Sequence, residues 1–102
     1  MIHHIVFFKI KEFSSESEKQ EAAGHVLEIF RSLAGQIPQL QSYRVEKDIL
    51  GGLASYDIII DSTFDSLEDL KAYQNHPAHQ EAAMKNKKWT ASKVTGDYET
   101  KN

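Results

Sequence analysis

Apolar and polar residues alternate in four stretches of the chain, which is the pattern of a strand with one face buried. The first stretch, residues 2–11, reads "IHHIVFFKIK" and places His4, Val6 and Phe8 together on one face. The other stretches are "QSYRVEKDI", "YDIIIDSTF" and "SKVTGDYE", at residues 41–49, 56–64 and 92–99. The pattern therefore predicts four strands.

Between these stretches, apolar residues recur three or four positions apart, as on one side of a helix. Ser15 followed by Glu18 is a capping-box pattern that predicts a helix start, and Gly35 predicts its end. Residues 65–75, "DSLEDLKAYQN", predict a second helix, and Pro77 suits the first turn of a third. The buried side of the second helix is expected to carry Leu67, Leu70 and Tyr73.

The order of these elements predicts the fold. A chain of 102 residues forms one domain, covering residues 1–102. The order β-α-β, β-α-α-β predicts a ferredoxin-like βαββαβ sandwich, an α+β fold with a four-stranded antiparallel sheet and helices on one face. The uncovered face would carry Ile5, Phe7 and Ile59, which is more apolar surface than a small monomer usually exposes. We therefore expect a homodimer that pairs sheet against sheet.

Composition excludes several classes of function. A net charge of −3 and a pI near 5.9 argue against binding to nucleic acid or to an anionic membrane surface. The chain has no cysteine, so disulfides and thiolate chemistry are excluded. No stretch approaches the roughly 20 apolar residues of a membrane helix, and the N-terminal stretch does not resemble a signal sequence. The expected location is the cytoplasm.

The segment "AYQNHPAHQEA", residues 72–82, concentrates the candidate chemistry. His76 and His79 lie three residues apart and could serve a reaction, a metal ion or only a junction between helices. Together with His3 and His4 they would offer four imidazoles to a metal. His3 and His4 point to opposite faces of their strand, however, and no neighbouring carboxylate or cysteine completes a ligand set. No metal site is expected.

Several segments resemble the stress-responsive A/B barrel domain family, often called Dabb. They are "MIHHIVFFKIK", "IPQLQSYRVEKD", "YDIIIDSTFDSLEDLKAYQNHPAHQEA" and "VTGDYE". The resemblance implies a dimeric α+β barrel in which the sheets of two chains close on each other. Some plant members of the family cyclise polyketides, others are stable stress-accumulated oligomers, and most bacterial members have no assigned activity. Related dimeric barrels include small monooxygenases and isomerases that work without a metal or bound cofactor, so none is expected here.

The resemblance to the cyclising members carries over to three positions, Tyr73, His79 and His4, as catalytic candidates. An intramolecular aldol cyclisation needs a base beside a carbonyl group and a donor for the oxyanion that develops. Neutral imidazole suits the first task and a phenol the second. His79 is expected in the first turn of its helix, where the positive end of the helix dipole disfavours the imidazolium form.

All three candidates are expected to meet in a cleft between the sheet and the helices. Tyr56 and Ile58 would line its floor, and Trp89 would lie near its mouth, as ligand-binding residues. Three functions remain compatible with the sequence. The chain is a cofactor-free cyclase, lyase or isomerase acting on a small apolar carbonyl compound, a module that only binds such a compound, or a structural oligomer without a ligand.

Overall fold

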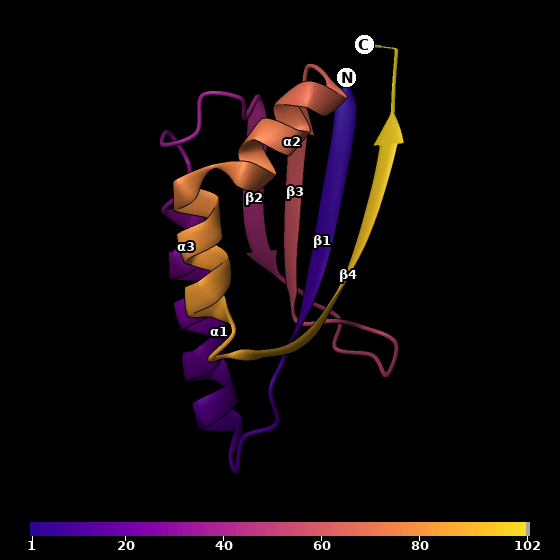
Figure 1. The fold of residues 1–102 in the computed structure, drawn as a ribbon. Helices are drawn as coiled ribbons and strands as arrows, with labels where there is room; N and C mark the ends of the chain where they lie inside the picture. The colour runs from indigo at the N-terminus through magenta and orange to yellow at the C-terminus, as the bar shows by residue number, and fades with distance from the viewer. Residues whose placement is uncertain (102) are drawn as a thin grey trace.

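The computed structural model describes residues 1–101, which form a four-stranded antiparallel sheet covered on one face by three helices (Figure 1). The elements are β1 (Ile2–Ile10), α1 (Glu16–Arg31), β2 (Ser42–Lys47), β3 (Ile58–Phe64), α2 (Leu67–Asn75), α3 (Pro77–Asn86) and β4 (Thr90–Glu99). The strand order across the sheet is β2-β3-β1-β4. The predicted ferredoxin-like sandwich is confirmed.

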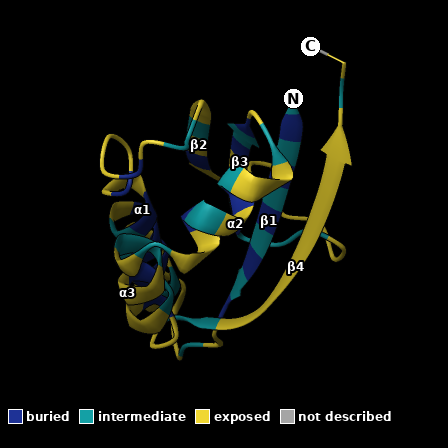
Figure 2. Ribbon diagram, turned by 45° about the horizontal axis from the view of Figure 1, so that its top comes forward, coloured by how far each residue is buried: buried dark blue, intermediate teal, exposed yellow. Residues whose placement is uncertain are grey.

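The core lies between the sheet and the helices because the strands alternate as the sequence predicts. Along β1, every second residue from Ile2 to Ile10 is buried, and the residues between them are half-buried on the open face. Phe30 of α1 packs against this layer, with its ring stacked on Phe8 at a centroid distance of 5.3 Å. Full burial of one such side chain contributes about 1.5–3 kcal/mol. β4, in contrast, is exposed over nearly its whole length at the outer edge of the sheet (Figure 2).

The helices begin at the residues that local sequence signals predict. The Ser15 hydroxyl accepts a hydrogen bond from the backbone N–H of Glu18 at the start of α1, and Ser66 caps α2 in the same way. Pro77 is the first residue of α3. His76 precedes it and accepts a hydrogen bond from the backbone N–H of Ala78 at 3.1 Å through Nδ1. His76 is therefore used as a helix cap.

Two details differ from the sequence predictions. α1 ends at Arg31 rather than at Gly35, which lies in the following turn with a φ of 81°. Leu67 is 59% exposed instead of buried. In a helix with 3.6 residues per turn, Leu67 and Tyr73 are separated by about 120° around the axis. α2 buries the side that carries Leu70 and Tyr73, so Leu67 falls outside it.

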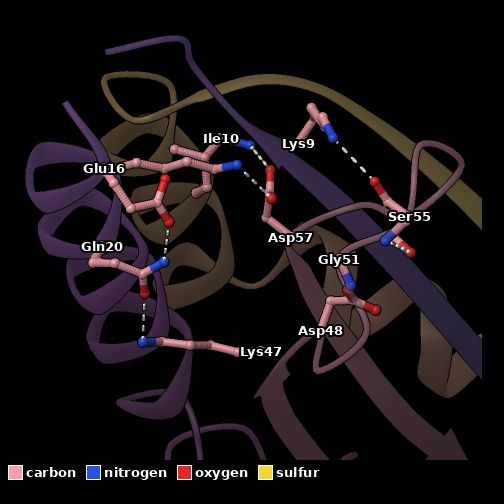
Figure 3. A network of polar contacts seen from close by, with 11 residues as sticks. Lys9, Ile10, Glu16, Gln20, Lys47, Asp48, Gly51, Ser55 and Asp57 are labelled. Atoms are coloured by element: carbon pink, nitrogen blue, oxygen red, sulfur yellow. Dashed lines mark hydrogen bonds and ion pairs between the residues drawn. The ribbon is translucent and has the colours of Figure 1, made fainter. Parts of the chain in front are cut away.

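A polar network fixes the loop between β2 and β3 (Figure 3). The Asp57 carboxylate accepts a hydrogen bond from the backbone N–H of Ile10 at 2.7 Å and pairs with Lys19 of α1 at 3.3 Å. The Lys9 ammonium donates to the backbone carbonyl of Ser55 at 3.0 Å. These contacts hold the end of the loop against β1 and the start of α1.

Replacing Gly24 by alanine is expected to stabilise the fold. Gly24 is exposed in the middle of α1, and an added Cβ would meet no heavy atom within 4 Å among the described residues outside its own helix backbone. Alanine restricts the unfolded chain and favours the helix, so the free energy of unfolding should rise by about 0.5–1 kcal/mol. Urea denaturation measures it. A decrease would mean that this side of α1 has a close neighbour in the assembled protein.

Candidate functional site

A cavity of about 470 Å³ opens between the helix-facing side of β1 and β4 and the helices α2 and α3. We call it the cleft. Its apolar floor is formed by Val6, Phe8, Phe30 and Ile60. Its polar lining includes His4, Tyr73, His79, Asn86, Lys87, Lys93 and Asp97. The volume lies within the range of about 300–1,000 Å³ that is usual for small-molecule sites.

His79 lies in the first turn of α3, two residues after Pro77, and lines the cleft. Its Nδ1 is buried and has no hydrogen-bond partner among residues 1–101. Burial lowers the pKa of His79 below its ordinary value of 6.5, an effect that the backbone of Gln74 partly opposes and the positive charge of Lys93 reinforces. The neutral imidazole therefore predominates at neutral pH, which is the form that can accept a proton.

The lowered pKa of His79 makes a testable contribution to stability. The unfolded chain binds a proton at this residue near pH 6.5, whereas the folded protein binds it only at lower pH. Stability should therefore be undiminished above pH 6.5 and should fall as the pH drops from 6.5 toward the lowered pKa. Chemical denaturation across this pH window should show that the free energy of unfolding falls more steeply with decreasing pH for the wild type than for His79→Gln. Identical pH profiles would contradict the assignment.

Tyr73 forms the wall between the two histidines of the cleft. Its ring centroid lies 4.5 Å from that of His79 and 6.4 Å from that of His4, in edge-to-face arrangements. The side chain is 2% exposed. Burial raises the pKa of Tyr73 to about 12, although the neighbouring Tyr43 acts in the opposite direction. The phenol is therefore protonated at neutral pH, and the Tyr43 hydroxyl itself donates to the Phe30 carbonyl at 2.9 Å.

His4 is buried in β1 and is held by a carboxylate from the neighbouring strand. Asp97 lies opposite His4 in the antiparallel pairing of β1 with β4, and its Oδ1 is hydrogen-bonded to His4 Nδ1. A carboxylate in this position fixes the orientation of the imidazole and favours a proton on Nδ1, which leaves Nε2 for other partners.

The cleft thus brings together His4, Tyr73 and His79, but it does not include the three predicted ligand-binding residues. Tyr56 precedes β3, so the alternation of that strand does not extend to it. Its ring packs instead against Phe7 on the open face, with the two ring centroids 6.5 Å apart. Ile58 is fully buried in the core. Trp89 stacks on His25 of α1 at 4.4 Å. None of the three lines the cleft in the described part of the chain.

Sequence reasoning also missed polar residues that the structure places in the cleft. Asp97 and Lys93 lie on β4, whose helix-facing positions are all polar, so no apolar residue marks that face of the strand as part of the site. Asn86 is 3% exposed at the end of α3; its Nδ2 donates to Thr90 at 3.2 Å, and its Oδ1 has no partner in residues 1–101. A buried polar side chain at a helix end gives no local signal, because its burial depends on the packing of distant elements.

The described residues lack two kinds of feature. They contain no group of three or more His, Cys, Asp or Glu side chains placed to hold a metal ion. They also contain no helix long and apolar enough to cross a membrane.

Comparisons with known proteins add three kinds of likeness. A model of the family described as the stress responsive A/B barrel domain matches residues 2–100. An uncharacterized protein of Streptomyces coelicolor is 36% identical over 99 residues, which cover 97% of this chain and 99% of that protein.

Solved structures share the fold. A dimeric ferredoxin-like protein of unknown function from Bacteroides fragilis is 28% identical, with a TM-score of 0.84 over 97% of this chain and 95% of its own. A hydroxynitrile lyase from Passiflora edulis is 19% identical, with a TM-score of 0.75 over 95% of this chain and 90% of its own. The second likeness concerns the fold alone.

Proposed function

The chain belongs to the stress responsive A/B barrel domain family, and on that premise we propose that it is a cofactor-free enzyme acting on a small, largely apolar, carbonyl-bearing molecule in the cleft. The observation that carries the proposal is the state of His79. It is a partly buried imidazole with a lowered pKa, at a cavity with an apolar floor and beside a second histidine and a phenol. Perturbed titratable groups in a cavity are typical of catalytic sites.

The chemistry that this arrangement supports begins with proton removal from the carbon next to a carbonyl group. His79 accepts that proton, and the electron pair moves onto the carbonyl oxygen to give an enolate. The protonated phenol of Tyr73, which lies beside His79, stabilises the oxyanion by donating a hydrogen bond. The enolate carbon then attacks a second carbonyl within the molecule, as in an aldol cyclisation, and the alkoxide that forms takes the proton back from His79. In an isomerisation, His79 instead returns the proton to another atom of the enolate.

Two features support an enzyme rather than a purely structural role. Two cleft residues, His79 and Asn86, each carry a buried polar side-chain atom without a partner in residues 1–101. Such atoms are uncommon in native proteins and are often explained by a ligand or a catalytic role. The Passiflora edulis protein, named a hydroxynitrile lyase, is an example of an enzyme with this fold.

We further propose that a second copy of the chain covers the open face of the sheet. This face carries Ile5, Phe7, Ile59, Val94 and Tyr98, and the last two are 46% and 53% exposed. The loop beside it exposes Ile49, Leu50 and Leu53 almost completely, at 99%, 86% and 109%. An apolar surface of this kind is typical of an interface. The Bacteroides fragilis neighbour is described as dimeric, which supports a second copy of the chain as the partner.

The proposed reaction can be tested without knowledge of the natural substrate. In D₂O, the protein should accelerate the exchange of the hydrogens beside the carbonyl of 4-phenylbutan-2-one, followed by ¹H NMR. The rate should saturate with ketone concentration and should exceed that of free imidazole at the same concentration. A rate equal to that of free imidazole would overturn the proposal.

A further inference from the structure

We propose that the molecule bound in the cleft carries a carboxylate, which Lys93 and Lys87 bind at the rim while the apolar body rests on the floor. This inference rests on the proposed function, because it specifies the class of compound that the same cleft accepts. It narrows that class from carbonyl compounds in general to small, largely apolar carbonyl-bearing monocarboxylates.

The two lysines reach the cleft from different elements. Lys93 lies on the helix-facing side of β4, opposite Phe8 in the pairing with β1. Lys87 follows the last residue of α3 and caps that helix. The side chains of both are exposed, and neither forms an ion pair or a hydrogen bond with another described residue. Both ammonium groups are therefore available to a ligand.

The charges around the cleft do not balance. Within the described residues, Asp97 is the sole carboxylate in the lining, and its Oδ1 is bonded to His4. Two ammonium groups thus face one carboxylate that is already engaged. The field of Lys93 reaches the interior of the site, since it contributes to the lowered pKa of His79. An anionic group on the ligand would neutralise this excess of positive charge.

The floor of the cleft determines which kind of body the rest of the ligand can have. Val6, Phe8 and Phe30 present aliphatic and aromatic surface, which suits an aromatic or branched hydrocarbon body. With the carboxylate at the exposed rim and the body on the floor, a carbonyl group between them would lie near His79 and Tyr73. In this arrangement the carboxylate stays at the exposed rim, and the carbonyl group is the only polar group of the ligand inside the cleft.

Binding of a matched acid and amide tests the inference. The probes are 4-oxo-4-phenylbutanoate and its neutral amide, which share size and ketone position and differ in one charge. Titration calorimetry at pH 7.5 and low salt should give a Kd for the acid about tenfold below that of the amide. Lys93→Gln should weaken binding of the acid about fivefold and leave the amide unchanged. The preference for the acid should shrink as salt is added.

Lys71→Gln is the matched control, because Lys71 is an exposed lysine of α2 that does not line the cleft. It should leave both Kd values unchanged. Equal affinities for acid and amide, or an equal loss in both lysine variants, would overturn the inference while leaving the proposed reaction intact. If neither probe binds and the neutral ketone shows no enhanced exchange, the inference and the proposed function fail together.

Discussion

Replacing His79 by glutamine is expected to slow the exchange of hydrogens beside the carbonyl of 4-phenylbutan-2-one by about 10²–10⁴-fold. Glutamine keeps much of the size and hydrogen-bonding capacity of the imidazole but cannot accept a proton near pH 7. The neutral imidazole required by the reaction follows from the partial burial of His79, which lowers its pKa. The effect should therefore appear in the rate at saturating ketone more than in the concentration needed for saturation.

His25→Gln provides the control for this variant. His25 is a histidine of α1 that stacks on Trp89 outside the cleft, so its loss should leave the exchange rate unchanged. Circular dichroism of both variants checks that the fold is intact. Unaltered exchange in His79→Gln, or an equal loss in His25→Gln, would show that His79 is not the base.

Replacing Phe7 by lysine is expected to convert the proposed dimer to monomers. Phe7 lies on the open face of β1, the central strand that pairs with both β3 and β4. A charged ammonium group buried between two sheets would lose its hydration without gaining a partner. The dissociation constant of the dimer should rise by at least about 100-fold. Sedimentation velocity over a range of protein concentrations measures it.

Leu67→Lys is the matched control for the dimer, since Leu67 is an exposed leucine on the helical side of the molecule. It introduces the same charge in place of an apolar side chain that lies away from the open face, so the dimer should persist. If Phe7→Lys sediments like the wild type and remains folded, the open face is not the interface. If both variants dissociate, the interface includes the helical side.

Much of the fold could be predicted because its signals are local. The alternation along residues 2–11 depends only on the period of a strand, and it placed His4, Val6 and Phe8 correctly on the helix-facing side. The helix starts at Ser15 and Ser66 follow from side chains that satisfy nearby backbone N–H groups. These signals require no knowledge of distant parts of the chain.

The composition of the site was harder to predict because it depends on register and strand boundaries. The prediction that Tyr56 lines the cleft extends the alternation of β3 two residues beyond the start of the strand at Ile58. The hydrogen bond between Asp97 and His4 joins residues 93 positions apart. It forms because the register of β1 against β4 places these two residues opposite each other. Local sequence patterns do not determine that register. The residues that resemblance suggested, His4, Tyr73 and His79, do meet in the structure.

The most direct test of a working site in the cleft is the side-chain pKa of His79, measured by NMR with and without 4-oxo-4-phenylbutanoate and 4-phenylbutan-2-one. We expect His79 to titrate below 6.5 in the free protein and its titration to shift when a ligand is added. A histidine that titrates near 6.5 and responds to neither compound would contradict the account. His79 would then serve only the junction between α2 and α3.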